Sequence, residues 1–409
     1  MVSRGDWIGG GASRGAEELA RWLIEAGHSV THFCWRFTQE PAPFQRQLGG
    51  PWPVRKTVQK LHAASRYLGF PHLLPFEYYA QLKWVQDSFD LFHFHDLIGT
   101  ISYSTLIALS RQKPVFFTVH DFSAFTGGCV YPMQCAKYET RCGECPQLGS
   151  WPMHTKIDRT GHMQDLRRRA AARRGIQYIF PCEWIERKMV EVMPLARPPV
   201  RMINSIDPEK IMPTAKNEAR QKLGLPLDRP VVLISAHFLS YERKGARYAL
   251  EAIRQVADMS PVVMTLGNSD PAIEGLIGGV RHTSFGFVPD PEKMALIYSA
   301  ADVYLFTSIA DNCPYTVLEA MGSGTATVGF ATGGVPELVA SEEAGLLVPV
   351  EDQAGLSAAL RRALQDRNLT QKWGNQARLR IEKYFNKRLF VEKMTHLYEE
   401  VRQDWKAES

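Results

Sequence analysis

Two carboxylates stand eight positions apart in the segment ADNCPYTVLEAMGSGTATVGFATGGVPELV, residues 310–339. Asp311 follows an apolar, strand-like run, and Glu319 lies in a short helix expected from Pro314 to Met321. The first backbone amides of that helix would form a site for an anion such as a diphosphate, and they belong to Tyr315, Thr316 and Val317. The two carboxylates could accept hydrogen bonds from the hydroxyl groups of a hexose and a ribose.

The spacing also has a structural explanation. Asp311 or Asn312 could cap the helix, and Glu319 could be an ordinary solvated helix residue. The residue types alone do not separate this alternative from ligand binding.

Three further motifs carry residues suited to phosphates or sugars. Lys244 lies in ERKG, residues 242–245, between a strand and a helix, and could neutralise a diphosphate or be a surface lysine in a loop. Gly10 and Gly11 lie in GGGASRG, residues 9–15, where they permit close approach of the backbone or simply form a tight turn. His120 ends the apolar run PVFFTVH, a position that suits either a structural or a ligand-binding histidine.

Short apolar runs alternate with amphipathic helical segments, which predicts two doubly wound α/β domains with parallel sheets. The expected strands are 30–35, 90–97, 114–120, 230–238, 261–267, 301–308 and 326–330, and the expected helices include 13–26, 245–257 and 355–366. Ligands of such sheets bind beyond the carboxyl ends of the strands, where the motifs above lie.

The polar segment 200–213 is the expected hinge between the domains. It predicts a first domain over residues 1–199, a second over 200–384, and a long amphipathic helix over 385–409. The net charge of the 409 residues is +5, a mild excess that suits an acidic ligand or an anionic membrane surface and does not require nucleic acid. The sequence shows no apolar run that could span a bilayer and no signal-peptide core, so we expect a cytoplasmic protein.

Four of the seven cysteines lie within one short stretch, at Cys129, Cys135, Cys142 and Cys145. Four thiolates in one loop could enclose a tetrahedral structural zinc ion, with no open position for catalysis. Reduced cysteines packed in a loop, or a disulfide pair, are the alternatives.

The motif at 310–339 resembles the signature of family 4 of the glycosyltransferases, which are retaining transferases of the GT-B fold. That signature is an acidic residue, seven residues, a glutamate, an alanine–methionine pair, a turn of small residues and Gly-Gly-x-Pro-Glu. The chain has Asp311, Glu319, Ala320-Met321 and Gly333-Gly334-Val335-Pro336-Glu337, and the resemblance extends over essentially its whole length. The family's common first residue is glutamate, so Asp311 is a departure, and it leaves the identity of the sugar open.

The resemblance implies a role for each matching residue. Glu319 would hold the ribose of the donor, Asp311 would face its sugar, and Lys244 would contact its diphosphate without a catalytic metal. His120 matches a histidine near the donor sugar and the acceptor, and Arg243 would replace an arginine that the family carries earlier. The other implied contacts are Gly10 and Gly11 in the loop over the phosphate, Phe287 and Val288 beside the nucleobase, and Asn312, Tyr315, Thr316 and Val317.

The implied function is transfer of a sugar, with retention, from a UDP- or GDP-type nucleotide sugar to a glycan or lipid-linked glycan in polysaccharide biosynthesis. The donor would bind in a cleft between the domains, and the helix at 385–409 would cross back to the first domain. A nucleotide-sugar epimerase and a non-catalytic scaffold of the same fold are the alternatives.

Two segments bear on the acceptor. The aromatic stretch 68–85 could bury against the domain or receive a glycan or lipid. The basic stretch 165–175 is expected to be a solvated helix face, with contact to anionic lipid at the inner face of the cell membrane as the alternative.

Overall fold

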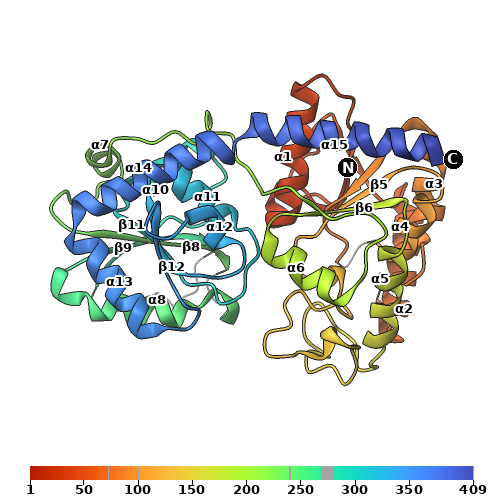
Figure 1. Ribbon diagram of the computed structural model, residues 1–409, viewed down its shortest axis with the longest axis horizontal. Helices are drawn as coiled ribbons and strands as arrows, with labels where there is room; N and C mark the ends of the chain where they lie inside the picture. The colour runs from red at the N-terminus through yellow and green to blue at the C-terminus, as the bar shows by residue number, and fades with distance from the viewer. Residues whose placement is uncertain (72, 99–100, 239–240, 269–279, 409) are drawn as a thin grey trace. The chain divides into compact units, whose positions relative to one another are not determined.

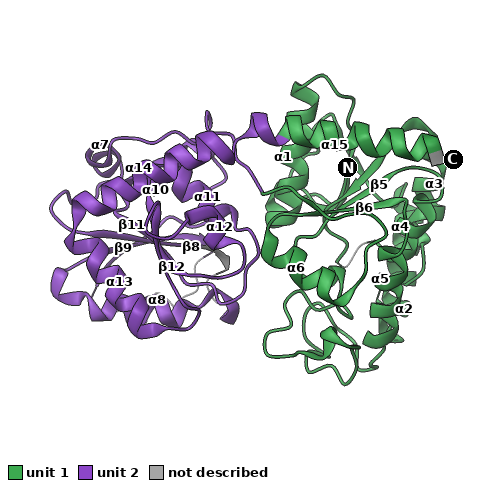
Figure 2. Ribbon diagram, viewed as in Figure 1, with its two compact units in different colours: residues 1–203, 391–409 green, residues 204–390 purple. Residues whose placement is uncertain are grey.

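The computed structural model describes residues 1–71, 73–98, 101–238, 241–268 and 280–408 (Figure 1). The chain divides into two compact units (Figure 2). Unit 1 contains residues 1–203 and 391–409, and unit 2 contains residues 204–390. The boundary at 203/204 lies inside the segment expected to be the hinge. No helix in these described ranges is long and apolar enough to cross a membrane.

Unit 1 is built on a seven-stranded parallel sheet in the order β3-β2-β1-β4-β5-β6-β7. Its strands are β1 Val2–Gly5, β2 His32–Arg36, β3 Gln45–Gln47, β4 Phe92–Phe94, β5 Val115–Thr118, β6 Ile176–Phe180 and β7 Val200–Arg201. The strand order reverses between β1 and β4. In open α/β sheets, ligands bind beyond the carboxyl ends of the strands at such a switch point.

The helices of unit 1 cover this sheet with apolar faces. They are α1 Gly11–Glu25, α2 Trp52–Tyr67, α3 Lys83–Val85, α4 Tyr103–Leu109, α5 Thr160–Ala171 and α6 Glu183–Val192, joined by much of α15, Lys387–Glu408. In α1, Ala16, Leu19, Ala20 and Leu23 recur at helical spacing and are all buried. All four residues of β5 are buried too, as a strand covered on both faces requires.

Unit 2 has a six-stranded parallel sheet in the order β10-β9-β8-β11-β12-β13. Its strands are β8 Val231–Phe238, β9 Val262–Asn268, β10 Arg281–Ser284, β11 Val303–Phe306, β12 Ala326–Phe330 and β13 Gly345–Val348. Here the order reverses between β8 and β11. Residues that follow these two strands therefore lie at the switch point of unit 2.

The helices of unit 2 are α7 Lys216–Lys222, α8 Ala246–Gln255, α10 Pro291–Ala300, α11 Tyr315–Gly322, α12 Val335–Val339, α13 Gln353–Gln365 and α14 Arg367–Tyr384. Helices α8 and α13 pack against each other, and α10 packs against α7 and α11 (Figure 1). A continuous apolar core joins β8, β11 and β12 to α8, α13 and α14, with Trp373 fully buried in it.

The two doubly wound parallel sheets predicted from the sequence are confirmed, with differences at several elements. Helix α1 begins at Gly11, so most of the segment expected to be a glycine loop at 9–15 is helical. Helix α11 is shifted by one residue from the expected 314–321. The expected C-terminal helix is present as α15, whose residues from Val391 onward belong to unit 1.

Candidate active site

An ion pair between Lys244 and Asp311 is at the centre of the site in unit 2. Lys244 ends a 3₁₀ turn, Glu242–Lys244, that follows β8, and Asp311 follows β11. Their Nζ and Oδ2 atoms are 2.5 Å apart. Arg243 Nη1 lies 3.8 Å from the same carboxylate oxygen and donates to the carbonyl of Ala310. Residues 67 positions apart thus meet at the switch point of the sheet.

Burial and charge act against each other in this pair. Burial favours the neutral form of Asp311, but the cations of Lys244 and Arg243 outweigh it, so the pKa of Asp311 lies below its ordinary value. Burial also lowers the pKa of Lys244, and Asp311 opposes that change. The arrangement leaves two cationic side chains around one carboxylate, which is an excess of positive charge suited to an anionic ligand.

Two glycines permit the close approach of these loops. Gly245 has φ of +64°, and a Cβ atom there would lie 2.0 Å from the carbonyl oxygen of Thr307. Gly333 has φ of +57°, and a Cβ atom there would lie 2.1 Å from the carbonyl oxygen of Asp311. The neighbouring Gly334 N–H donates to the carbonyl of Asn312 at 2.7 Å. The Gly-Gly pair of the motif therefore packs directly on the loop that carries Asp311.

The N-cap position of α11 is occupied by Pro314, so neither Asp311 nor Asn312 is the N-cap residue. Proline has no side chain able to accept a hydrogen bond. Asn204 instead holds the loop before the helix, because its Nδ2 donates to the carbonyl of Cys313 at 2.9 Å. The first turn of α11 consists of Tyr315, Thr316 and Val317. The amide of Val317 is already used in part, because it donates to the carbonyl of Pro314 at 3.2 Å.

Glu319 is 2% exposed, so the alternative in which it is a solvated helix residue is wrong. Its Oε2 accepts a hydrogen bond from the hydroxyl of Tyr298, on α10, at 3.1 Å. A buried carboxylate is costly unless it is hydrogen-bonded, so Tyr298 fixes its position. The sequence contained no signal for this partner, which comes from a different helix.

The loop after β10 carries the residues expected beside a nucleobase. Gly286 has φ of +64°, and its carbonyl accepts a hydrogen bond from Gly267 at 2.8 Å. Phe287 is 38% exposed while Val288 is buried, so one apolar ring is presented on the surface and the next side chain anchors the loop.

Three histidines lie in a row at the ends of β4 and β5 in unit 1: His93 within β4, His95 directly after β4, and His120 after β5. His95 Nδ1 and His120 Nε2 are 3.1 Å apart, and the ring of His93 lies 4.2 Å from that of His95. His93 is bonded to the hydroxyls of Tyr398, on α15, and Thr118 at 2.6 and 2.7 Å. Burial lowers the pKa of His120 to about 4 and holds the pKa of His95 well below its ordinary value, so both rings are neutral at pH 7.

His95 was not among the residues expected from the sequence, and its position explains why. It contacts His120 only because β4 and β5 are neighbours in the sheet.

On the other side of the switch point, Gly10 has φ of +115° and precedes α1. A Cβ atom at Gly10 would meet nothing within 4 Å, so this position offers open space above the first turn of α1, where Gly11 lies.

The four cysteines of the 129–145 loop line one small pocket together with Gly127, Lys137 and Tyr138. All seven cysteines are free thiols, so the disulfide alternative is not what the structure shows. Burial raises the pKa of Cys129 to about 12, and the pKa values of Cys142 and Cys145 are also raised. No group of three or more His, Cys, Asp or Glu residues is placed to hold a metal ion within the described ranges, so the sulfurs are not already gathered around a metal position.

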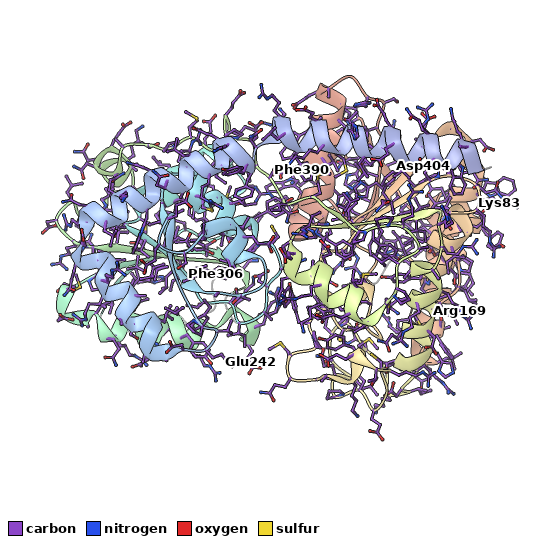
Figure 3. All side chains as sticks on the ribbon, in the orientation of Figure 1. Lys83, Arg169, Glu242, Phe306, Phe390 and Asp404 are labelled. Atoms are coloured by element: carbon purple, nitrogen blue, oxygen red, sulfur yellow. The ribbon has the colours of Figure 1, made fainter. Side chains whose placement is uncertain are left out.

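The basic stretch 165–175 was expected to be a solvated helix face, but one of its arginines is buried. Arg167, on α5, is 6% exposed. Its Nε donates to the carbonyl of Ser123 at 2.6 Å, and its Nη1 donates to that of Met163 at 2.8 Å. In contrast, Arg169 on the same helix lies on the outside of unit 1 (Figure 3).

Two family models match the chain in succession. Residues 9–210 match the model described as Glycosyltransferase Family 4, and residues 215–380 match Glycosyl transferases group 1. The chain is 27% identical over 231 residues to a putative colanic acid biosynthesis glycosyl transferase, WcaC, of Escherichia coli K12. The aligned region covers 54% of this chain and 53% of that protein. The chain therefore spans about half the length of this curated relative.

Solved structures share the fold over nearly the full length. Sucrose-phosphate synthase from Thermosynechococcus elongatus has a TM-score of 0.75 at 23% identity, covering 99% of both chains. Anabaena HepE, solved in complex with UDP-glucose, has a TM-score of 0.65 at 17% identity, covering 98% of this chain and 99% of its own. The GT-B architecture expected from the sequence is thus confirmed.

We predict that Gly333→Ala lowers the thermal unfolding midpoint more than Gly324→Ala does. Both positions have left-handed φ, where alanine costs roughly 1–2 kcal/mol. At Gly324 the nearest atom, Pro213 Cβ, is 3.6 Å from the added methyl group, whereas at Gly333 the methyl group must displace the Asp311 loop. Equal midpoints for the two variants would contradict the close packing described above.

The buried histidines predict that acid destabilises the protein. Between the ordinary value of 6.5 and about 4, His120 binds a proton in the unfolded chain but not in the folded one. Stability therefore falls as pH is lowered through this window. His120→Gln should make the unfolding midpoint less dependent on pH, and the dependence that remains includes the other buried histidines, His32, His93 and His95.

His396→Gln is the matched control, because its side chain is 81% exposed and should leave the pH dependence unchanged. A pH dependence in His120→Gln that is as steep as that of the unmodified chain would show that His120 is not the group responsible.

Proposed function

The chain belongs to the family 4, group 1 glycosyltransferases, and from this we propose that it moves a sugar from a nucleotide diphosphate donor to a glycan or lipid-linked glycan in polysaccharide biosynthesis. The observation that carries the proposal is the ion pair of Lys244 and Asp311 at the switch point of unit 2. Two relatives named for colanic acid biosynthesis support the polysaccharide assignment.

In the proposed reaction, the residues of unit 2 bind the donor and stabilise the leaving group. Lys244, Arg243 and the first amides of α11 provide positive charge where the diphosphate develops negative charge. Asp311, held by Lys244, orients the sugar, and Glu319, held by Tyr298, accepts from the ribose. These groups position the donor without a catalytic metal.

The donor base is proposed to be uracil or guanine. Anabaena HepE was solved with UDP and with UDP-glucose, which supports UDP for a related fold. Phe287 provides an exposed aromatic ring on which a base can stack. In unit 1, neutral His120 is proposed to contact the sugar or the acceptor hydroxyl.

The retaining outcome is proposed from family membership, and proton NMR of the product tests it. With an α-linked nucleotide sugar as donor, the transferred sugar should be α-linked in the product. A β-linked product would overturn retention. Conversion of the donor to nucleotide and free sugar without need of an acceptor would instead support an epimerase, and no turnover with any donor would support a scaffold.

We predict that Lys244→Ala and Glu319→Ala each weaken UDP binding by at least roughly tenfold, because each removes a charged hydrogen bond to the nucleotide. Titration calorimetry with UDP and GDP measures the effect. Lys222→Ala is the control, because this exposed lysine of α7 pairs only with Glu218 in the described residues. Unchanged UDP and GDP affinity in both site variants would remove the assignment of the site.

The cysteine loop is proposed to bind a structural zinc ion. The four thiols line one pocket, and one of the sulfurs already accepts a hydrogen bond, as thiolate ligands commonly do. Gly127 N–H donates to Cys142 Sγ at 3.1 Å. Because the thiol pKa values are raised, zinc must displace protons and bring the sulfurs together.

We predict about one zinc ion per chain in protein purified under reducing conditions, as measured by elemental mass spectrometry. Cys142→Ser should lose the metal, and Cys182→Ser, a buried thiol outside the loop, should retain it. Removal of zinc by a chelator should lower the thermal unfolding midpoint. Protein that stays free of zinc after incubation with the metal would reject the site.

A contact with anionic membrane is proposed for the outer surface of α2 and of the segment that ends in α3. Tyr67 and Trp84 are 80% and 74% exposed, and Trp52 and Tyr79 are also exposed. Lysines lie over these rings, with Lys56 6.0 Å from Trp52 and Lys83 5.5 Å from Trp84; Lys83 is on the outside of unit 1 (Figure 3). Exposed aromatic rings with basic side chains suit a lipid interface.

We predict that the chain cosediments with phosphatidylglycerol vesicles and only weakly with phosphatidylcholine vesicles. Trp84→Ala should reduce the bound fraction several-fold, and Leu379→Ala, an exposed apolar residue of unit 2, should not. Equal binding to both lipids, or no effect of Trp84→Ala, would argue against this surface.

A further inference from the structure

Arg167 is a buried cation with no carboxylate partner among the described residues. Its guanidinium donates to two backbone carbonyls, of Ser123 and Met163, and lies 4.7 Å from the centre of the Tyr103 ring. The ion pairs on α5 involve Asp165 and Arg168, and none within the described ranges involves Arg167. A buried charge without a counter-ion is costly, and carbonyl groups compensate only part of that cost. The position favours a ligand that brings negative charge.

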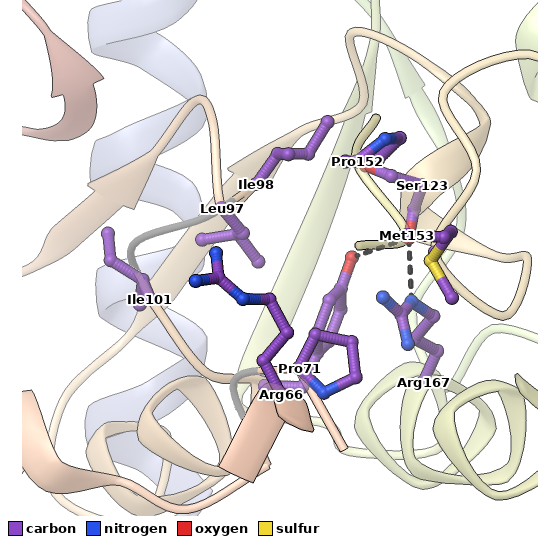
Figure 4. A pocket seen from close by; sticks show the side chains of 11 residues that line it. Arg66, Pro71, Leu97, Ile98, Ile101, Ser123, Pro152, Met153 and Arg167 are labelled. Carbon is purple, nitrogen blue, oxygen red and sulfur yellow. Dashed lines mark hydrogen bonds between the residues drawn. The ribbon is translucent and has the colours of Figure 1, made fainter. Parts of the chain in front are cut away.

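A small pocket opens beside this arginine, lined on its other side by Arg66 from α2 (Figure 4). No carboxylate is found among the described residues that line the pocket, and the two guanidinium groups lie on opposite sides of it. Apolar side chains complete the wall, including Leu97, Ile101 and Met153. Two cations within an apolar wall select a ligand that is both anionic and partly apolar.

Glycine at position 128 allows the side chain of Met153 to pack closely beside Arg167. Its φ is +140°, and a Cβ atom there would lie 2.5 Å from Met153 Sδ and 3.9 Å from Arg167 Nη2. The two hydrogen bonds that the guanidinium makes among the described residues use Nε and Nη1, and the third nitrogen, Nη2, makes none there. That nitrogen is the donor left for a ligand.

Two carboxylates in the loops that follow β4 and β5 already accept hydrogen bonds from backbone amides. Asp96 accepts from the amide of Ile98 and is paired electrostatically with Arg4, although burial raises its pKa. Asp121 accepts from the amide of Ser123 at 2.8 Å. Neither lines the pocket, so the two arginines are not neutralised by these groups.

The pocket lies beyond the same strand ends as the histidine row. Leu97 follows His95 by two residues after β4, and Ser123 follows His120 by three residues after β5. We infer that Arg66 and Arg167 bind an anionic group, a phosphate or a carboxylate, on the acceptor of the transferase. This inference rests on the proposed function, because it takes the residues beyond these strands as the acceptor side.

Titration calorimetry on the full chain, with the nucleotide site saturated by UDP, tests this inference. The probes are phenyl phosphate, benzoate and the neutral benzyl alcohol, all with an aromatic body. Phenyl phosphate, benzoate or both should bind, and benzyl alcohol should not. The anion that binds more tightly shows whether the pocket prefers a phosphate or a carboxylate. Arg167→Gln and Arg66→Gln should each weaken that anion at least tenfold.

Arg169→Gln is the matched control, because it removes a charge from the same helix at an exposed position outside the pocket. Arg167→Gln also loses two backbone contacts and could unfold, whereas the Arg66 guanidinium has no partner among the described residues, so Arg66→Gln keeps the test decisive. Equal binding of benzyl alcohol, or anion affinity unchanged in Arg66→Gln, would overturn the inference.

The donor assignment can fail separately. If UDP does not bind, the proposed donor site is wrong, and the titration is repeated without nucleotide in Lys244→Ala, which removes the other cationic site. Anion binding that still depends on Arg66 would then support the pocket alone, and anion binding that is absent or independent of Arg66 would overturn it.

Discussion

The close contact between residue 333 and the carbonyl oxygen of Asp311 constrains the whole site in unit 2. A side chain at 333 would begin 2.1 Å from that oxygen, so only glycine allows the loop after β11 to lie against the loop after β12. That contact places the Asp311 carboxylate next to Lys244, and Gly245 makes the equivalent approach possible on the β8 side. The ion pair, the start of α11 and the buried Glu319 all depend on loops that are packed this tightly.

The two units differ in their electrostatics, and each suits a different part of the proposed sugar transfer. Unit 2 keeps its carboxylate and lysine charged in a buried pair, with a further arginine that leaves net positive charge for a diphosphate. Unit 1 keeps its histidine row neutral by burial, which suits hydrogen bonding to sugar hydroxyl groups rather than binding of charge. Unit 1 also has two cationic side chains near the histidine row, Arg66 and Arg167. They lie among apolar side chains in the pocket beyond β4 and β5.

Much of the fold was predictable because its signals are local. Apolar runs such as 326–330 coincide with strands, and the helix that carries Glu319 is bounded by Pro314 and the following glycines. What was missed depends on contacts between distant segments. The partner of Glu319 is Tyr298 on another helix, the partner of His120 is His95 on the neighbouring strand, and Arg167 is buried by the loop at Ser123. A run of arginines in the sequence gives no sign of which one points inward.

The central claim is that the donor diphosphate is held at Lys244 and the first turn of α11. A crystal structure of the chain with an intact nucleotide sugar tests it most directly. The account predicts a phosphate oxygen within about 4 Å of Lys244 Nζ, the distance of an ion pair, and a ribose hydroxyl hydrogen-bonded to Glu319. Density for the nucleotide elsewhere on the protein, or a diphosphate with Lys244 turned away from it, would contradict the account.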